Sequence, residues 1–239
     1  FALQARTGQW TDAEDTWQLL DPMGRKWRRE GYRPGDAEWR YAEAQFWKGK
    51  LQEADLVVAE HLANDGKNRV GIRGLHLLRG KWRLERGEWE LAVASFQEAV
   101  RLARERAVSD AEIETGLALA KFHLGQLVDP RREAEQLALV RNPAHRLLAN
   151  LWLAIGDHEQ AQKQALAAYE WAWSDGIPYV NSYELRKTIA LLEQLGTPLP
   201  NIPPYDASQD DKLPWEDAVA TAIQNLQSQQ AGRQRKELD

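Results

Sequence analysis

A glycine recurs in this chain at the interval expected of a helical hairpin repeat. The two central intervals, from Gly49 to Gly87 and from Gly87 to Gly125, are both 38 residues long. The full series of turn glycines is Gly8, Gly49, Gly87, Gly125, Gly156 and Gly196. Each follows a stretch of helical periodicity, and two helices of about 12 residues with their turns fill such a period. The sequence therefore predicts stacked helical hairpins.

The residues that follow each glycine indicate how these hairpins pack. In the clearest copy, Gly87 precedes Trp89, Ala92, Phe96 and Ala99, which fall on one side of a helix. Glycine permits a positive φ at the turn, alanine lets helices cross closely, and the aromatic rings fill the space between neighbouring hairpins. We therefore interpret most of the 11 tryptophans as core residues.

This pattern resembles the tetratricopeptide repeat family. The copies that carry the resemblance are Gly8-Gln9-Trp10 with Ala13 and Trp17, Gly49-Lys50-Leu51 with Ala54 and Val58, the copy at Gly87, and Gly156-Asp157-His158 with Ala161, Ala165 and Ala168. The resemblance implies an all-α fold, a right-handed α-solenoid of about five TPR-like hairpins over residues 1–196, with the first hairpin truncated. It also implies that the first helix of each hairpin lines the inner curve.

The copy at Gly125 departs from the pattern. Asp129 and Pro130 follow the glycine and push the first alanine to Ala134. Aspartate is a good N-cap and proline a good first helical residue, so the second helix of this hairpin should begin late.

The composition changes after Gly196. Residues 197–214 are rich in proline and predict an extended linker, either packed across the end of the array or acting as a flexible tether. Residues 215–230 predict an amphipathic helix that caps the solenoid or docks on a partner, and residues 231–239 form a polar tail.

The overall composition argues against several classes of function. The chain has 239 residues, 43% of them hydrophobic, and a net charge of -5, which supplies a core and argues against nonspecific nucleic-acid binding. The absence of cysteine excludes disulfides, thiolate metal sites and cysteine nucleophiles, and is compatible with any compartment. Because the chain has no apolar run long enough to cross a membrane and no signal-peptide pattern, we expect a cytoplasmic protein. Because the chain opens on Phe1 with a shortened first repeat, we expect an upstream domain in a longer parent protein.

The sequence contains neither the zinc-binding motif nor the phosphate loop that two of its segments partly resemble. His158-Glu159 lacks the second histidine of a zinc-binding motif because position 162 is glutamine. Gly80-Lys81 lacks the serine or threonine of a phosphate loop, since Trp82 stands there. We therefore expect neither an enzyme nor a metal or cofactor site.

The candidate binding residues begin with a basic stripe on the helix before Gly87. Its members on one side of the helix are Arg69, Arg73, His76, Arg79, Arg83 and Arg86, whereas Lys81 falls outside. Such a face suits an acidic peptide, a terminal carboxylate or a phosphate. The alternative is an inter-repeat ion-pair ladder with acidic residues of the neighbouring first helices, namely Glu38, Glu43, Asp110, Glu112 and Glu114.

Two further features point to a groove. Trp39, Phe46 and Trp47 lie close together on a first helix and predict an exposed aromatic shelf for a peptide. Asn150 interrupts an apolar run where helices of the resembled family often carry an asparagine that bonds a peptide backbone. An inter-helix hydrogen bond is an equal alternative for this side chain.

These observations lead to two hypotheses. The first is a protein- or peptide-binding scaffold that serves as the sensor or interaction arm of a larger, bacterial signalling protein and recognises an acidic partner in its groove. The second is a structural self-assembly module with no groove ligand, in which the helix at 215–230 or the outer helices join copies of the chain.

Overall fold

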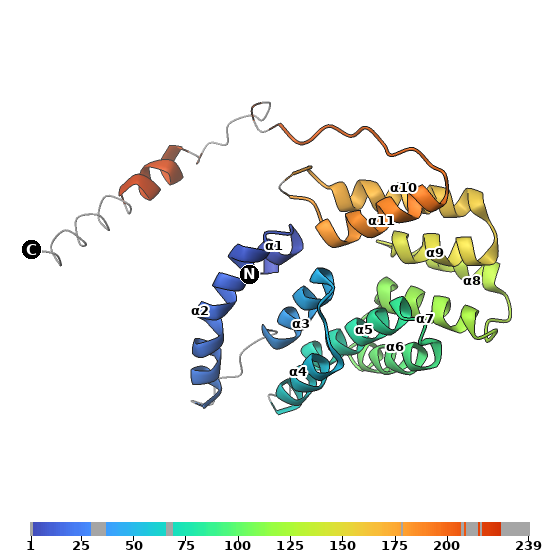
Figure 1. The fold of residues 1–239 in the computed structure, drawn as a ribbon, viewed down its shortest axis with the longest axis horizontal. Helices are drawn as coiled ribbons and strands as arrows, with labels where there is room; N and C mark the ends of the chain where they lie inside the picture. The colour runs from blue at the N-terminus through green and yellow to red at the C-terminus, as the bar shows by residue number, and fades with distance from the viewer. Residues whose placement is uncertain are drawn as a thin grey trace, which may run out of the picture. The chain divides into compact units, whose positions relative to one another are not determined.

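The computed structural model describes residues 2–29, 37–65, 69–177, 179–206, 208, 215 and 217–225. These residues form helices and turns and contain no strand, which confirms the all-α class (Figure 1). The chain divides into two units, Phe1–Pro203 and Pro204–Asp239. Among the described residues, no helix combines the length and apolar character that crossing a membrane requires.

The first unit is built from eleven helices along its described residues. They are α1 (Ala2–Arg6), α2 (Trp10–Arg29), α3 (Ala37–Lys48), α4 (Glu53–Asp65), α5 (Arg69–Glu85), α6 (Trp89–Arg104), α7 (Ala111–His123), α8 (Pro130–Ala138), α9 (His145–Ile155), α10 (His158–Trp173) and α11 (Ser182–Gln194).

The predicted turn glycines occupy the predicted turns. All six have a positive φ, between 65 and 89°. Gly156 shows why glycine is needed, since it ends α9 in the left-handed conformation at φ 89° while its N–H and that of Asp157 bond carbonyls in the last turn of the helix. The late start of α8 is also confirmed, with Asp129 as N-cap and Pro130 in the first turn.

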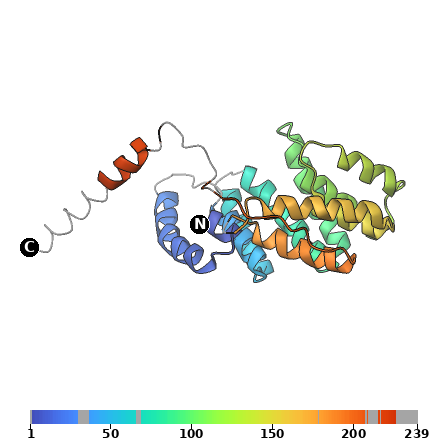
Figure 2. The same cartoon turned by 90° about the horizontal axis from the view of Figure 1, so that it is seen from above.

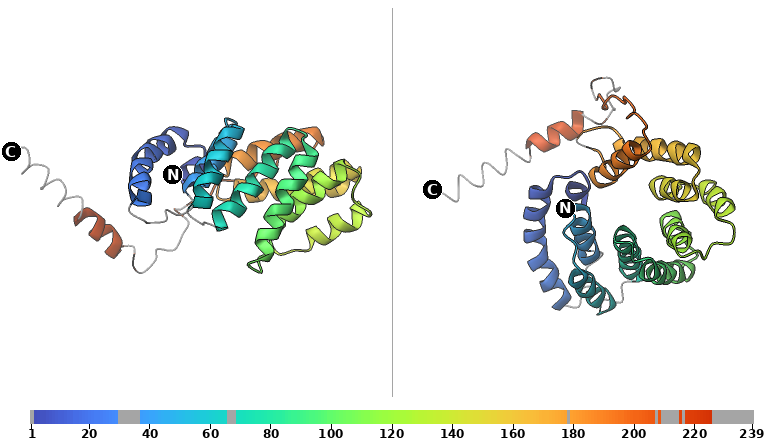
Figure 3. Two further views of the ribbon diagram at one scale, coloured as in Figure 1. Left: turned by 90° about the horizontal axis from the view of Figure 1, so that it is seen from below. Right: turned by 45° about the vertical axis from the view of Figure 1, so that its right-hand side comes forward.

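The odd-numbered helices pack against one another in succession. Contacts join α1 to α3, α3 to α5, α5 to α7, α7 to α9 and α9 to α11, while each odd-numbered helix from α1 to α9 also packs against the helix that follows it. The right-hand view of Figure 3 shows these helices following one another around a ring, so that α11 comes to lie beside the first helices.

Phe96 is at the centre of the largest core cluster. Its side chain is fully buried between α5 and α7, at two positions where those helices carry glycine. A Cβ atom added to Gly80 or Gly116 would lie 2.6 or 2.5 Å from the Phe96 ring. Phe96 therefore fills the space between α5 and α7, and the two glycines create that space.

The segment after α11 is extended, and its first part belongs to the first unit. Thr197 is buried and Ile202 packs against the core cluster of α9, α10 and α11. In the second unit, residues 217–225 form a helix, drawn in red in Figure 2, and every one of them is exposed. Its predicted capping role stays a prediction, and residues 226–239 lie outside the described residues.

Candidate functional site

Arg79 and Arg83 of the basic stripe of α5 are directed at α4 and α6. Arg79 forms an ion pair with Glu60 of α4 at 2.6 Å, and Arg83 pairs with Glu53 of the same helix at 3.3 Å. Arg83 also donates to the Ser95 hydroxyl of α6 at 2.9 Å. We call the pairs Arg79–Glu60 and Arg83–Glu53 the outer ladder.

Two other arginines of the stripe also form ion pairs. Arg73 pairs with Asp110 at 3.4 Å, and Arg86 with Glu88 at 2.6 Å. His76 is half-buried, and burial lowers the pKa of its imidazole. The Arg69 side chain lies outside the described residues. Of these acids only Asp110 is one that the ladder alternative named, since Glu60 and Glu53 belong to α4 and Glu88 follows the turn after α5.

Lys81, which the helical projection excluded from the stripe, is the basic residue of α5 that faces the interior. Its Nζ lies 2.5 Å from a Glu112 oxygen of α7 and 3.7 Å from Glu184 of α11. Burial alone would lower the pKa of the Lys81 ammonium, but the two carboxylates outweigh burial and raise it. Lys81 is therefore a buried cation.

A second buried ion pair lies beside Lys81. Arg146 of α9 donates to both oxygens of Glu184, at 2.5 and 3.1 Å. Burial alone would raise the pKa of the Glu184 carboxyl, but Arg146 and Lys81 together hold it below its usual value. Glu85 accepts a hydrogen bond from the Tyr183 hydroxyl and one from Lys187 at 2.9 Å. We call these groups the central network: Lys81, Glu85, Glu112, Arg146, Tyr183, Glu184 and Lys187.

Two of the cavities beside the central network differ in their lining. The first, which we call the leucine cavity, has a volume of about 470 Å³. Its apolar wall consists of Leu84, Leu119, Leu147, Leu153, Ala154, Ala190 and Leu191. Its polar wall consists of Lys81, Glu85, Arg146, Asn150, Lys187 and Gln194, and Trp89 and His123 complete it. The rings of Trp89 and His123 stack with centroids 4.0 Å apart.

The second cavity has about 400 Å³ and an opposite charge balance, and we call it the carboxylate cavity. It is lined by Asp110, Glu112 and Glu184 against the single guanidinium of Arg146, together with Trp171 and other residues. The leucine cavity has three cations against one carboxylate. Cations therefore predominate in the wall of the leucine cavity and carboxylates in the wall of the carboxylate cavity, and Arg146 lines both.

Asn150 lies in the wall of the leucine cavity. Its Nδ2 donates to the Arg146 carbonyl at 2.9 Å, one turn earlier in α9. Its Oδ1 has no hydrogen-bond partner among the described residues. The geometry thus satisfies half of the amide within its own helix and leaves an acceptor at the cavity.

The aromatic shelf expected from the sequence is not exposed as a unit. Phe46 is buried because the ring of Tyr183 packs on it, with centroids 4.9 Å apart. Trp39 and Trp47 are half-buried against the same cluster, and the Arg40 guanidinium lies 3.8 Å from the Trp39 ring centre. The shelf expectation was wrong for Phe46, because α11 covers this part of α3.

The described residues contain no cluster of three or more histidine, aspartate and glutamate side chains that could hold a metal ion. Comparison with protein-family models, with curated proteins and with solved structures finds no match to this chain.

Proposed function

We propose that the first unit is a TPR-like α-solenoid that binds a protein or peptide segment at the leucine cavity. The succession of contacts between odd-numbered helices supports the repeat interpretation, because it is the neighbour-to-neighbour packing of a hairpin array. This proposal includes a right-handed superhelix and membership of the tetratricopeptide repeat family.

The leucine cavity is the observation that carries the proposed function. At about 470 Å³ it has the size of a typical ligand pocket, which is roughly 300–1,000 Å³. Its apolar wall suits a hydrophobic side chain of the partner. Because helices use their backbone groups internally, the amides of Asn150 and Gln194 are the groups available to bond a peptide backbone. Lys187 and its neighbouring cations favour a partner with an acidic residue next to the hydrophobic one.

The scaffold would serve as the sensor or interaction arm of a larger regulatory protein, which the repeat resemblance supports. The competing function is self-assembly. It is favoured by exposed apolar residues outside the interior, with Val57 and Val58 of α4 56% and 58% exposed and Ile223 of the 217–225 helix 49% exposed.

A filled-cavity variant tests the binding function. We would screen an array of peptides that pair hydrophobic with acidic residues, and measure the affinity of the hits by fluorescence anisotropy. Ala154→Trp, in the cavity wall, should abolish binding, whereas Ala94→Trp on the exposed side of α6 should leave it unchanged. Circular dichroism establishes that both variants fold. Equal binding by both variants would exclude the cavity.

Light scattering distinguishes the self-assembly function. A mass that rises with concentration in wild type, and falls to that of one chain in Val57→Glu/Val58→Glu, would support assembly through α4. A concentration-independent monomer mass would remove this function.

A further inference from the structure

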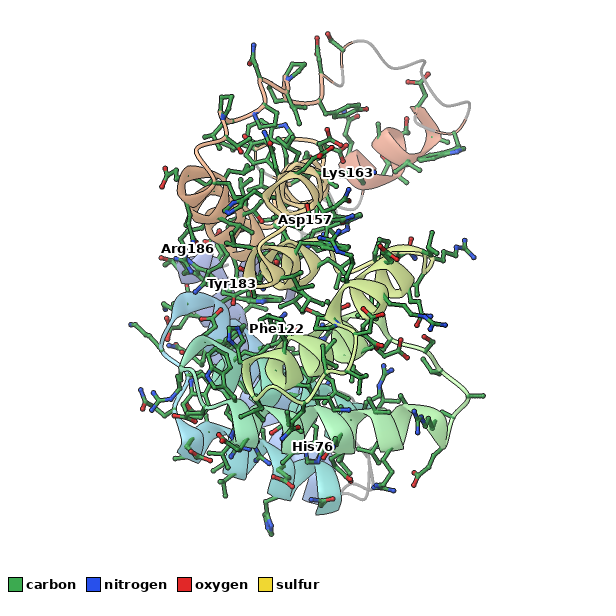
Figure 4. The ribbon with its side chains drawn as sticks, turned by 90° about the vertical axis from the view of Figure 1, so that its right-hand side faces the viewer. His76, Phe122, Asp157, Lys163, Tyr183 and Arg186 are labelled. Atoms are coloured by element: carbon green, nitrogen blue, oxygen red, sulfur yellow. The ribbon has the colours of Figure 1, made fainter. Side chains whose placement is uncertain are left out.

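Helix α11 contacts helices that precede it by more than 90 residues. The Ser182 hydroxyl donates to the Arg6 carbonyl of α1 at 3.1 Å, and Arg186 donates to the Trp47 carbonyl of α3 at 2.9 Å. Lys187 and Tyr183 both bond Glu85 of α5. Figure 4 shows Tyr183 and Arg186 where α11 meets the blue helices at the start of the chain.

The contacts on the two sides of α11 differ in burial. Toward α9 and α10 they are buried, with Leu191 and Leu192 in the apolar cluster of those helices and Glu184 in the ion pair with Arg146. Toward α1, α3 and α5 the bonds of Ser182, Arg186 and Lys187 are exposed. The buried contacts on this side are the ring of Tyr183 and the 3.7 Å approach of Lys81 to Glu184. Water and salt can replace exposed polar contacts, whereas they do not replace buried apolar packing. The weaker side of α11 is therefore the one that faces the first helices.

The turn between α1 and α2 is shaped to receive α11. A Cβ atom added to Gly8 would lie 3.0 Å from the Ser182 hydroxyl and 3.2 Å from its Cβ. Only a residue without a side chain permits this approach without displacing Ser182, so Gly8 serves the closure as well as its own turn at φ 82°.

Closure by α11 also forms one wall of the leucine cavity. Lys187, Ala190, Leu191 and Gln194 all line it. Displacement of α11 from α5 would therefore widen the cavity between α5 and α11, while the walls from α7 and α9 keep their own packing.

We propose that α11 is a latch that opens and closes the array, and that its release from α1, α3 and α5 admits a partner segment to the leucine cavity. The admission of a partner segment rests on the proposed function, whereas the opening and closing of the latch does not. Arg186 and Tyr183 hold the latch, and neither lines the cavity.

Spin labels can follow the latch directly because the chain contains no cysteine. We would label the full chain at the exposed positions Lys50→Cys, after α3, and Glu193→Cys, near the end of α11, and measure the distance distribution by pulsed electron resonance. The closed array predicts one narrow peak. Tyr183→Phe/Arg186→Ala, and separately high salt, should add a population at longer distance.

A matched control removes an arginine pair elsewhere. Arg131→Ala breaks the exposed pair with Asp157 at 2.7 Å, and should leave the narrow peak unchanged. Since the double variant could lose stability, Arg186→Ala alone is measured as well, and thermal unfolding establishes that each variant is folded. A narrow peak that neither latch variant nor salt alters would overturn the latch.

The screened peptides that pair hydrophobic with acidic residues distinguish the latch from the binding function. If the latch gates the cavity, a peptide that binds should increase the long-distance population, and the latch variant should associate about tenfold faster if its open population rises tenfold. If the long-distance population appears but no peptide binds, the latch stands and the binding function fails. If peptides bind at an unchanged rate and the narrow peak persists, the binding function stands and the latch is wrong.

Discussion

The outer ladder and the central network contain the same kind of ion pair in two different environments. Arg79–Glu60 has side chains that are 14% and 31% exposed, whereas those of Arg146–Glu184 are 11% and 13% exposed. Glu60 can be hydrated if its arginine is lost, but Glu184 cannot be hydrated to the same extent. We infer that the effect of removing an arginine on the free energy of unfolding depends on the burial of the glutamate that remains. It depends less on the distance between the two side chains.

The largest effect is expected from Arg146→Met. Removal of the guanidinium leaves the Glu184 carboxylate buried with Lys81 3.7 Å away as its remaining cation. The free energy of unfolding at pH 7 should fall by about 3–5 kcal/mol. Urea denaturation followed by circular dichroism measures it. A loss of stability below about 1 kcal/mol would contradict this expectation, because it would equal the small effect expected for the outer ladder.

The same variant should depend on pH in a distinct way. The wild-type pKa of Glu184 is lowered, so its ion pair stabilises the fold above the unfolded-state pKa near 4.5, and this contribution is lost as pH falls through the folded pKa. Without Arg146, burial raises the pKa of Glu184, and the carboxyl takes up a proton at higher pH. The stability difference between wild type and Arg146→Met should therefore shrink between pH 7 and pH 4. Urea titrations at both values measure it, and a constant difference would contradict this assignment.

Close packing around Phe96 gives the next effect. In Gly116→Ala the new Cβ would lie 2.5 Å from the Phe96 ring, so α7 must shift away from α6 and carry Glu112 with it. Overpacking should lower the free energy of unfolding by about 1–3 kcal/mol. A Phe96→Leu substitution in the same chain should recover part of the loss. Thermal and urea unfolding check both, and an unchanged or raised stability for Gly116→Ala would show that the site has room.

The outer ladder should give the smallest effect. Arg79→Met leaves Glu60 partly exposed to water, so the free energy of unfolding should change by about 1 kcal/mol or less. High salt should reduce this change further. Urea unfolding at low and high salt measures it, and a loss as large as that of Arg146→Met would abolish the distinction between the two regions.

The six turns could be predicted because each has a glycine at its positive φ, whereas Ala107, Asn142 and Ser174 have a positive φ without a glycine to indicate it. The start of α8 was predicted for the same reason, since Asp129 and Pro130 satisfy the helix end on which they lie. Such features depend on residues within a few positions of one another.

The central network could not be predicted because its members come from distant parts of the chain. A helical projection gives the direction of Lys81 but not the helix that lies there, and its partner Glu112 is 31 residues away. Tyr183 and Glu85 are separated by 98 residues. The projection therefore selected the arginines of the outer ladder as a group and set aside the lysine that the ring closure buries. Asn150 was found through its polarity in an apolar run, which is a local signal.

A pair of double-mutant cycles tests the central claim most directly. One cycle combines Arg146→Met with Glu184→Leu, and the other combines Arg79→Met with Glu60→Leu. Each coupling energy follows from urea unfolding of the wild type, the two single variants and the double variant. We predict a coupling of roughly 2–3 kcal/mol for the inner pair and less than about 0.5 kcal/mol for the outer pair. Equal couplings in the two cycles would contradict the account, because the interior would then hold its charges no differently from the surface.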